Sequence, residues 1–294
     1  MILVTGATGT VGSALLPKLL EREEEVRVLV RDPRGLGRLR VEVRIVLGDL
    51  ADLSDPRVIR GALRGASTVI HLAAAIRDQP RARVEELNGL ATARLLRAAE
   101  AAGIERFVFF SAIGATAIQR TRFFRAKALA EEAVLASELQ TTVFAPSIVY
   151  APDDPWVRIQ RRLALLPAIP ISGEGRAAYE PIWADDVARC VLADLDGGPG
   201  SRRHELAGPD LLTYDQLARL IARAAGHERP LVHVPLGLVH YGLAGLRRVV
   251  GDAAFATWEE AELMEVPMVS SAGDADAQAL GVEPRRMVEV LGGP

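Results

Sequence analysis

The sequence predicts an α/β fold, with a doubly wound parallel sheet and a small, mainly helical C-terminal lobe. Short apolar runs rich in valine, isoleucine and phenylalanine alternate with longer helical segments through the first 150 residues, which is typical of a parallel sheet. The runs are apolar at successive positions, as expected of strands that are covered on both faces. A turn-rich break over residues 151–155 then separates this alternation from a segment with a different pattern.

The first half of the chain is expected to contain six strands, which cover residues 2–5, 26–30, 43–47, 68–72, 106–111 and 142–147. Helices are expected between them at 10–23, 56–64, 82–102 and 123–138, with a weaker candidate at 33–39. The helix over 123–138 has an expected apolar face made of Ala126, Leu129, Ala133, Val134 and Leu135.

The pattern after the break predicts the lobe. Residues 156–180 hold one helix and a loop rich in proline and glycine, 184–195 return to a helical pattern, 204–207 form a candidate strand, and 213–290 are mostly helical. We therefore expect residues 1–150 plus about 181–209 to form the domain that contains the sheet. Residues 151–180 and 210–294 are expected to form a lobe that contacts a substrate or a partner.

Composition limits the classes of function. The net charge of −3 and the isoelectric point near 6.0 give no general attraction to nucleic acid. The one cysteine, Cys190, lies in an apolar helical context and is expected in the core, which fits a reducing compartment. Because residues 2–4 already form an expected strand, we expect no signal peptide and a cytoplasmic location.

The apolar stretch 231–246 is interrupted by His233, Pro235 and His240 and is too short to cross a bilayer. Two alternatives remain for this stretch: a helix packed in the lobe, or a segment that contacts a membrane surface or a partner. The five histidines lack metal-binding spacing and there is no cysteine cluster, so no metal site is expected. A G-x-S-x-G motif is also missing, which disfavours a serine hydrolase.

A glycine-rich turn stands between the first expected strand and the first expected helix. Residues 5–12 read Thr-Gly-Ala-Thr-Gly-Thr-Val-Gly. The first glycine permits a tight turn, the second removes the Cβ that would block a pyrophosphate, and the third lets the helix pack closely. The helix N-terminus offers N–H groups to the phosphates, so the turn predicts a Rossmann-type dinucleotide site, the alternative being a turn without a ligand. The candidate residues are Gly6, Thr8, Gly9, Thr10, Val11 and Gly12.

The end of the second strand bears on the choice of cofactor. A basic side chain there accommodates the 2′-phosphate of NADP, whereas an acidic one binds the 2′-hydroxyl of NAD. Arg31 and Arg34 favour NADP, and Asp32 leaves NAD as the alternative.

Two further strand ends are expected to contact the cofactor. Asp49 and Leu50 follow the third strand, where a carboxylate can accept the adenine amino group, although a turn aspartate is the alternative. Ala73 and Ala74 follow the fourth strand, and their small side chains would let the cofactor lie over the carboxyl edge of the sheet. His71, at the end of that strand, is expected in the core.

Together these residues resemble the short-chain dehydrogenase/reductase superfamily, in its extended and atypical branches. The resemblance continues through Asn88, Ser111, Lys127 and the segment 146–150 to residues 181–209, so it covers nearly the whole chain. It is strongest to the atypical group that contains the nucleotide-binding accessory subunit of respiratory complex I.

The resemblance implies a Rossmann domain with a smaller lobe over the nicotinamide end. In active members a serine or threonine acts with a tyrosine placed four residues before a lysine, because the ammonium group stabilises the phenolate. The resemblance also implies that Lys127 contacts the nicotinamide ribose. The alternative is a surface lysine that pairs with Glu131 at i+4.

The chain departs from the family pattern at the tyrosine, because Phe123 stands four residues before Lys127 and has no proton to donate. Ser111, Lys127 and Tyr150 remain as candidate catalytic residues. Tyr150 could also be a packing residue. Other candidate proton sources are Tyr179 and a water held by Ser111 or Thr116, with a structural role expected for Tyr179.

Two functions are therefore open. One is an NAD(P)H-dependent reductase, or an isomerase such as an epimerase, of a small molecule, since hydride transfer needs only cofactor and substrate held in line. The other is a non-catalytic NAD(P)-binding sensor, assembly factor or structural subunit with a protein partner. NADP is the expected cofactor, with NAD as the alternative, and no nucleic-acid partner is expected.

Overall fold

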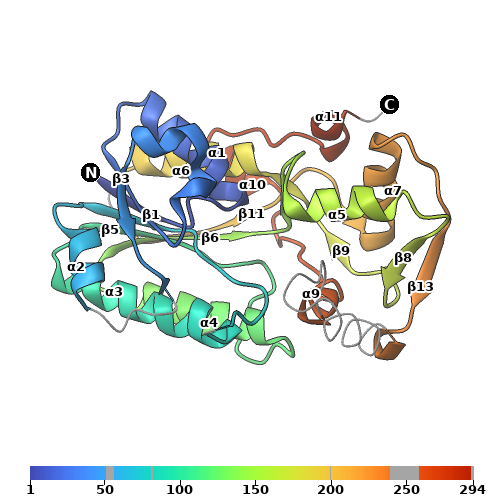
Figure 1. The fold of residues 1–294 in the computed structure, drawn as a ribbon, viewed down its shortest axis with the longest axis horizontal. Coiled ribbons are helices and arrows are strands. Elements are labelled where there is room, and N and C mark those ends of the chain that lie inside the picture. The colour runs from blue at the N-terminus through green and yellow to red at the C-terminus, as the bar shows by residue number, and fades with distance from the viewer. Residues whose placement is uncertain (51–55, 81, 199, 239–257, 293–294) are drawn as a thin grey trace.

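In the computed structural model, which describes residues 1–50, 56–80, 82–198, 200–238 and 258–292, the strands build a parallel sheet. Among these residues the sheet has seven strands, in the order β11-β6-β5-β4-β1-β2-β3 (Figure 1). The strands are β1 (Ile2–Thr5), β2 (Val26–Val30), β3 (Arg44–Leu47), β4 (Thr68–His71), β5 (Arg106–Phe110), β6 (Gln140–Pro146) and β11 (Arg202–Leu206). Every pairing within it is parallel.

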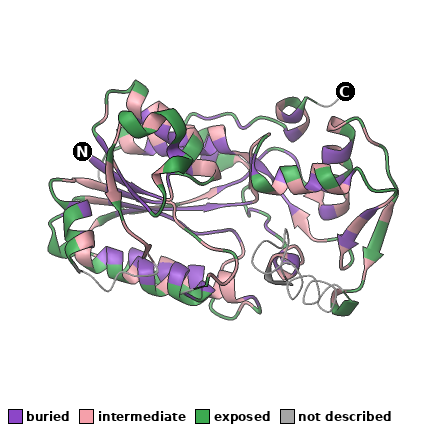
Figure 2. Ribbon diagram, viewed as in Figure 1, coloured by how far each residue is buried: buried purple, intermediate pink, exposed green. Residues whose placement is uncertain are grey.

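The six strands predicted in the first half are confirmed, with ends that move by one or two residues. The seventh, β11, extends the predicted strand at 204–207 toward its N-terminus and pairs with β6. The central strands β1, β4 and β5 are buried along almost their whole length, because helices cover both faces of the sheet (Figure 2).

Helices lie on the two faces of the sheet. One face carries α1 (Thr10–Glu21) and α6 (Ala184–Asp196), which contact each other, and the other carries α2 (Pro56–Leu63), α3 (Ala91–Ala101) and α4 (Arg122–Leu135) (Figure 1). A π-helical turn, η3 (Glu86–Leu90), leads into α3, and a 3₁₀ segment, η1 (Pro33–Val41), follows β2. This is the expected doubly wound arrangement.

Buried apolar side chains fill the space between the sheet and each helical layer. Leu15, Leu19 and Val191 pack on the first face, and Leu63 and Leu95 on the second, all of them almost fully buried. Cys190 is buried as expected, and burial raises the pKa of its thiol to about 12, so this cysteine is a core residue.

Helix α4 buries a different face from the one its sequence suggests. Leu129 is 58% exposed and Leu135 is 43% exposed, although both were expected to face inward. The side chains that α4 buries are Phe124, Ala126, Lys127, Ala130 and Val134. The helix is therefore turned so that a lysine points into the molecule.

The strand order reverses between β1 and β4. The chain passes from β1 outward through β2 to β3 and then returns to β4, which pairs with the other side of β1. In sheets of this kind ligands bind beyond the carboxyl ends of the strands at such a reversal. The glycine turn follows β1 and Ala73 follows β4, so both lie at this point.

The lobe lies beyond the carboxyl ends of β5 and β6 and combines helices with short strand pairs (Figure 1). Its helices are α5 (Pro155–Leu163), α7 (Tyr214–Ala224), α9 (Trp258–Leu263) and α11 (Met287–Leu291), while α10 (Ala275–Ala279) packs on β11. Three strand pairs were not expected from the sequence: β7 (Val149–Tyr150) with β10 (Ile182–Trp183), β8 (Ile169–Ser172) with β13 (Leu231–Val234), and β9 (Ala178–Tyr179) with β12 (Leu212–Thr213).

No helix in the described part of the chain is long and apolar enough to cross a membrane. Of the apolar stretch 231–246, residues 231–234 form β13, residues 236–238 are helical, and 239–246 lie outside the described residues. His240 is among the latter, so the surface-contact alternative for this stretch stays a prediction.

Candidate functional site

The glycine turn is held by backbone contacts that leave no room for side chains. Gly6 has a φ of +73°, and a Cβ there would lie 2.5 Å from the amide nitrogen of Ala73. A Cβ on Gly12 would lie 2.4 Å from the carbonyl oxygen of Gly6. The fold itself therefore requires both glycines, and the Ala73 contact joins the turn to the end of β4.

Gly9 differs from these two glycines. A Cβ at this position would meet only the carbonyl oxygen of Gly6, at 3.3 Å. Gly9 caps α1 without a side-chain bond, and the first turn of the helix has no acidic residue. The N–H groups at this helix end are therefore available to an anion. Thr8 is exposed, and Thr10 and Val11 are half-buried beside them.

Residues after β2 lie against the glycine turn. A Cβ on Gly35 would lie 2.9 Å from Cγ2 of Thr8, so η1 packs on the turn. The Asp32 carboxylate accepts hydrogen bonds from the backbone and guanidinium of Arg34, with an ion-pair distance of 2.6 Å. Asp32 is thus bound to Arg34, whereas Arg31 is exposed and has no partner among the described residues.

The remaining predicted cofactor contacts lie at neighbouring strand ends. Asp49 and Leu50 follow β3 and are half-buried. Ala73 is half-buried and lies directly beside Gly6, and Ala74 is exposed. The structure therefore brings the predicted residues after β1, β2, β3 and β4 to one edge of the sheet.

A buried asparagine fixes the loop after β4. The Asn88 side chain accepts a hydrogen bond from the Ala75 amide at 3.2 Å and donates to the Ala75 carbonyl at 2.7 Å. It also donates to the carbonyl of Val84 at 2.8 Å. Because the Asn88 amide bonds both the N–H and the carbonyl of Ala75, it fixes the path of the loop that passes the cofactor edge.

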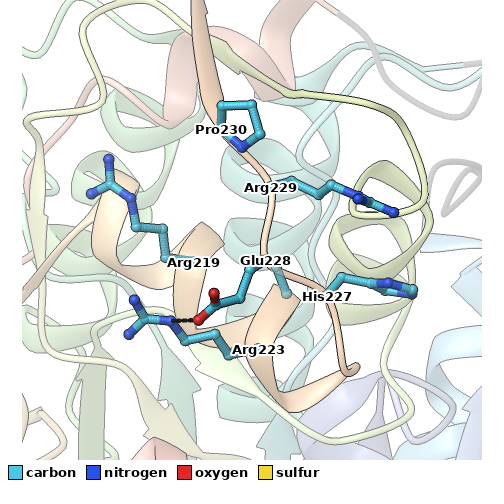
Figure 3. Close-up of a pocket in the computed structure, with 7 residues that line it drawn as sticks. Arg219, Arg223, His227, Glu228, Arg229 and Pro230 are labelled. Carbon is cyan, nitrogen blue, oxygen red and sulfur yellow. Dashed lines mark ion pairs between the residues drawn. The ribbon is translucent and has the colours of Figure 1, made fainter.

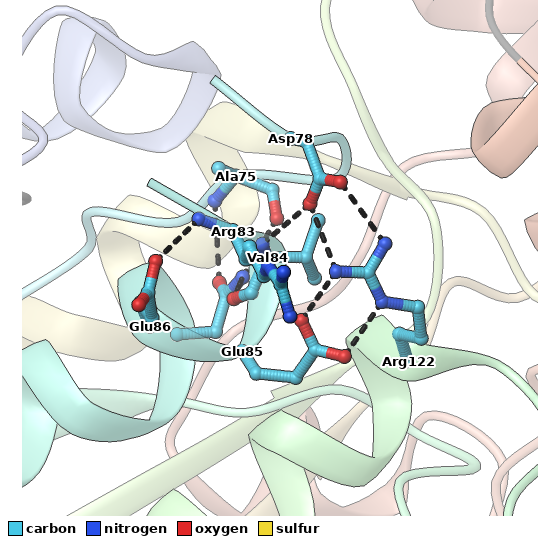
Figure 4. Close-up of polar contacts among 8 residues, drawn as sticks. Ala75, Asp78, Arg83, Val84, Glu85, Glu86 and Arg122 are labelled. Atoms are coloured by element: carbon cyan, nitrogen blue, oxygen red, sulfur yellow. Dashed lines mark hydrogen bonds and ion pairs between the residues drawn. The ribbon is translucent and has the colours of Figure 1, made fainter. Parts of the chain in front are cut away.

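Arg122 ties the same loop to the N-terminus of α4 (Figure 4). Its guanidinium donates to Asp78 at 3.0 Å and to Glu85 at 2.6 Å through different nitrogens. Asp78 also accepts the backbone N–H of Val84. These contacts raise the pKa of Arg122 and lower those of Asp78 and Glu85. Sequence reasoning missed this bridge because its members are far apart along the chain.

Lys127 is buried, which excludes the alternative of a surface lysine that pairs with Glu131, and the expected contact with the nicotinamide ribose stays a prediction. Its ammonium donates to the carbonyl oxygen of Phe110 at 2.6 Å. The rings of Phe109 and Phe123 lie 4.9 Å and 5.9 Å from its nitrogen. Burial lowers the pKa of Lys127 to about 7, and the charge of Glu131 offsets part of that effect.

His71 lies in the core, as expected. Thr5 and Thr92 each hold one ring nitrogen, at 2.6 Å and 3.0 Å. Burial and the nearby Lys127 charge lower the pKa of His71 to about 3. The imidazole is therefore neutral at physiological pH and has both nitrogens engaged, which makes it a structural residue.

Ser111 continues the chain from β5 at the same strand end. Its side chain is 5% exposed, and its hydroxyl has no hydrogen-bond partner in the described structure. The next residues contact the lobe, because a Cβ on Gly114 would lie 3.2 Å from the carbonyl oxygen of Pro267. Thr116 is exposed. A buried hydroxyl without a partner is costly, and this one lies where the lobe meets the sheet.

The two tyrosines have the environment of packing residues. Tyr150 is fully buried in β7 with an unpartnered hydroxyl, and burial together with the charges of Asp186 and Asp210 raises its pKa. This favours the packing alternative, and its catalytic role stays a prediction. The Tyr179 hydroxyl donates to the carbonyl oxygen of Met264 at 2.5 Å, as suits the structural role expected of it.

A separate hollow of about 310 Å³ lies at the far end of the lobe, beside the C-terminal end of α7 (Figure 3). Its lining is mostly basic, and Glu228 pairs with Arg223 at 3.6 Å across it. The lining residues are Arg219, Ala222, Arg223, His227, Glu228, Arg229 and Pro230. This hollow is not part of the cofactor edge. Within the described ranges no group of three or more potential ligands could hold a metal ion.

The residues at the cofactor edge fit a nicotinamide dinucleotide. The turn at Gly9 is open where a pyrophosphate needs close approach, and the helix N–H groups behind it are uncapped. The Ser111 hydroxyl and the Lys127 ammonium provide buried polar groups at the other end of the same edge. A bound dinucleotide would supply hydride-transfer chemistry at this end.

Comparisons with known proteins agree with this fit. The family model described as NAD(P)H-binding matches residues 6–195. The chain is 31% identical over 229 residues to NADH dehydrogenase [ubiquinone] 1 alpha subcomplex subunit 9, mitochondrial, of Arabidopsis thaliana, which covers 74% of this chain and 56% of that one. The chain therefore spans little more than half the length of the plant subunit.

Two further relatives are matched over most of their length. Sterol demethylase protein B of Methylococcus capsulatus is 31% identical, with 83% of this chain and 80% of that one covered. The NAD(P)H azoreductase of Xenophilus azovorans is 29% identical, with 81% and 78% covered.

A solved structure shares the fold over the whole chain. The crystal structure of gox2253 superposes with a TM-score of 0.75 at 25% identity and covers 100% of this chain and 96% of that one. The predicted α/β fold and the predicted nucleotide-binding function are both confirmed. The chain belongs to the NAD(P)H-binding family, whose model covers residues 6–195.

Proposed function

We propose that this protein is an NAD(P)H-dependent reductase of a small molecule, with NADPH as the preferred cofactor. The observation that carries the proposal is Lys127. It is one of only two lysines in a chain with 35 basic residues, and it is buried as an amine at the strand edge where the nicotinamide end of a dinucleotide would lie. A group that merely filled space there would not need a charge, because burying one costs free energy.

The roles of the other residues follow from their positions. Gly6, Gly9 and Gly12 hold the pyrophosphate on the N-terminus of α1. Arg31 donates to the oxygens of the 2′-phosphate, and it is assigned this role because Arg34 is already bound to Asp32. Residues 1–150 with about 181–209 hold the cofactor, and the remaining residues, 151–180 and 210–294, hold the acceptor. Asp49, Leu50, Ala73 and Ala74 line the cofactor between these points.

The proposed reaction class, reduction by NAD(P)H, rests on a relative's name and on this site. The azoreductase at 29% identity is named for NAD(P)H. Reduction by NAD(P)H suits this site because its glycine turn and helix N-terminus match the dinucleotide-binding pattern. A cytoplasmic setting is part of the proposal, since a single buried cysteine is what a reducing compartment favours.

A second candidate function is a non-catalytic nucleotide-binding subunit or assembly factor. Phe123 favours it, because the usual proton donor of the superfamily is replaced at that position. The likeness to a subunit of NADH dehydrogenase points the same way. In that case the protein partner would take the place of the small-molecule substrate.

Oxidation of NADPH separates the two functions. The purified protein is mixed with NADPH and a panel of azo compounds, quinones and apolar ketones, and the loss of reduced nicotinamide absorbance is followed. The proposal predicts protein-dependent oxidation with one class of acceptor, and Gly9→Ala should slow it by about tenfold or more at limiting NADPH. Tight NADPH binding without oxidation by any acceptor would contradict it and favour the non-catalytic subunit.

A further inference from the structure

Positive charge is concentrated in two segments of the lobe. Residues 155–173 contain three arginines and no acidic residue, and residues 216–238 contain three arginines and one glutamate. The two segments therefore carry a surplus of five positive charges, although the whole chain has a net charge of −3. A local surplus of this kind indicates a part of the surface that attracts anions. The six arginines are Arg158, Arg161, Arg162, Arg219, Arg223 and Arg229.

The fold brings these two segments together at the far end of the lobe. Helix α5 packs against α7. Strand β8 pairs in parallel with β13, so that Ile169 lies opposite Leu231, and the Ile169 N–H donates to the carbonyl of Pro230 at 2.9 Å. The turn that leaves α5 therefore lies beside the segment that leaves α7. We call residues 161–168 and 227–232 the lobe tip, and Figure 1 shows it at the end of the long axis that is farthest from the sheet.

The lobe tip exposes large apolar side chains. Leu165 is 64% exposed and Leu166 44% in the turn after α5, and Val232 is 51% exposed on β13. Their neighbours Leu163 and Leu231 pack against the core of the lobe instead. Figure 2 shows the ribbon of this end largely in the colour of exposed residues. Large apolar side chains that lie close together in water are unfavourable, and they indicate a surface that an apolar environment covers.

Unpaired arginines flank these apolar side chains. Arg162 and Arg229 are exposed, and neither forms an ion pair with another residue in the described ranges. The Nε atom of Arg161 is buried and has no hydrogen-bond partner in the same part of the chain. A guanidinium group binds phosphate oxygens through a planar fork of N–H donors. The lobe tip therefore offers unused donors for phosphate groups directly beside an apolar surface.

The basic hollow at the end of α7 adds cations to the lobe tip. Arg223 and Glu228 form a loose ion pair at 3.6 Å, so this carboxylate neutralises little of the charge around the hollow of about 310 Å³. Figure 3 shows that Arg219 and Arg223 point to one side of the chain segment that carries Glu228, whereas His227 and Arg229 point to the other. One small anion cannot meet cations on both sides, but a surface with many phosphate groups can.

We propose that the lobe tip binds the surface of a membrane that contains anionic phospholipids. Leu165, Leu166 and Val232 enter the boundary between headgroups and acyl chains. Arg162 and Arg229 donate to the phosphate oxygens of the headgroups around them, and the hollow behind them holds a further headgroup. This inference goes beyond the proposed function and does not depend on it, because the cofactor edge lies at the sheet and not at the lobe tip.

Two features together decide the occupant of this surface. Apolar side chains alone would suit another protein, and arginines alone would suit a soluble anion. Apolar side chains with cations beside them are typical of a protein surface that lies in a membrane interface, where the apolar groups leave water and the cations remain at the level of the phosphates. The attraction acts over about a Debye length, so the net negative charge of the whole chain does not cancel it.

Sedimentation with lipid vesicles tests the inference. The whole protein is mixed with vesicles of phosphatidylcholine alone, or of phosphatidylcholine and phosphatidylglycerol in equal amounts, at low and at physiological salt. The inference predicts binding to the anionic vesicles that is at least about tenfold tighter than to the neutral ones and that weakens as salt is added. Equal binding to both kinds of vesicle, or binding to neither, would overturn it.

Matched variants locate the binding surface. Leu165→Ser should weaken binding to the anionic vesicles by about fivefold or more, whereas Leu129→Ser, at a leucine that is 58% exposed on α4, should not change it. Arg229→Gln should weaken binding by about fivefold, whereas Arg97→Gln, at an exposed arginine of α3, should not. All four side chains are exposed, and circular dichroism shows that each variant is folded. Equal losses in the variants and their controls would overturn the assignment to the lobe tip.

Two further arms separate a membrane from other anionic ligands. Inorganic phosphate and glycerol phosphate are added to the protein during thermal unfolding, without vesicles. The inference predicts no rise of Tm at millimolar concentration, because a single small anion meets only part of the cations. A rise of Tm with phosphate in a protein that does not bind vesicles would overturn the inference and make the hollow a site for a soluble anion. Neither arm contains NADPH, so failure of the proposed reductase function leaves every result readable.

Discussion

Two ends of one sheet edge are built in different ways. The end that we propose for the phosphates is made of backbone, namely Gly6, Gly9, Gly12 and the first turn of α1. The end that we propose for the nicotinamide is made of side chains, mainly Ser111, Phe123 and Lys127. The backbone site matches the superfamily pattern residue by residue, whereas the side-chain site has changed its decisive member. A backbone site fails if any close approach is blocked, but a side-chain site can exchange one group for another and keep its shape.

The difference has an electrostatic side as well. At the phosphate end the protein offers the partial positive charge of backbone N–H groups, which every helix N-terminus has, so no full charge is buried there. At the nicotinamide end it keeps a full charge away from water, next to aromatic rings. The second arrangement costs stability, and this cost provides the largest measurable effect.

Lys127 should make stability depend on pH above neutrality. The unfolded chain titrates at about 10.5 and the folded one at about 7. Between these values the unfolded chain binds more protons, so the free energy of unfolding rises with pH across this window and the penalty is fully present below pH 7. The expected rise is on the order of a few kcal/mol. The measurement is urea unfolding of the wild type and of Lys127→Met at both ends of this pH window. Equal changes of the free energy of unfolding with pH in the two proteins would contradict the prediction.

The requirement for Gly12 can be tested against another glycine inside a helix. Gly12→Ala should lower the free energy of unfolding by about 1–3 kcal/mol, because the new Cβ meets backbone atoms of the turn. Gly61→Ala in α2 meets nothing within 4 Å and should be neutral or stabilising by up to about 1 kcal/mol through helix propensity. Chemical denaturation of both variants decides the matter, and equal effects would show that helix propensity alone governs both positions.

Gly9→Ala should separate binding from folding. A Cβ at Gly9 would make one tight contact, at 3.3 Å from the carbonyl oxygen of Gly6, which a small shift of the turn relieves, so the free energy of unfolding should change by less than about 1 kcal/mol. The same Cβ would obstruct the pyrophosphate, and NADPH affinity should fall by about tenfold or more. Calorimetric titration measures this fall, and unchanged affinity would move the phosphate site elsewhere.

Arg31 and Arg34 form a matched pair for the cofactor choice. Arg31→Gln should weaken NADPH binding by about tenfold, the size of one hydrogen bond to a charged group, and leave NADH binding unchanged. Arg34→Gln should have a smaller effect, since Asp32 already holds that guanidinium. If neither change alters the ratio of NADPH to NADH affinity, the preference for NADP is wrong.

The smallest effect is expected at the bridge between the loop after β4 and α4. Arg122→Gln removes both of its ion pairs, but these side chains are about one-third exposed, so the cost should be about 1 kcal/mol or less. Arg120→Gln, an exposed neighbour, is the control. Thermal unfolding and limited proteolysis report the change, and a loss larger than that of Gly12→Ala would mean that the bridge organises far more of the fold than its exposure suggests.

The features that the sequence predicts depend on neighbours along the chain. The six strands of the first half follow from runs of apolar residues, and the glycine turn follows from its spacing between a strand and a helix. The core position of Cys190 follows from its apolar context. Each of these is a local signal, which explains why the structure confirms them.

The features that the sequence does not predict depend on contacts across the fold. The apolar pattern of 123–138 indicates that Leu129 and Leu135 face inward, yet α4 leaves both exposed and turns Lys127 toward the interior. The bridge from Arg122 to Asp78 joins residues 44 positions apart. The lobe pairs form between short strands whose partners are fixed only when the chain is folded.

The central claim is that this edge of the sheet binds a nicotinamide dinucleotide, and calorimetric titration of the purified protein tests it most directly. NADPH, NADH, NADP and NAD are titrated in turn into the wild type and into Gly9→Ala. The account predicts saturable binding to the wild type, tightest for NADPH, and affinity lower by about tenfold or more in the variant. No binding of any of the four at millimolar concentration would contradict it.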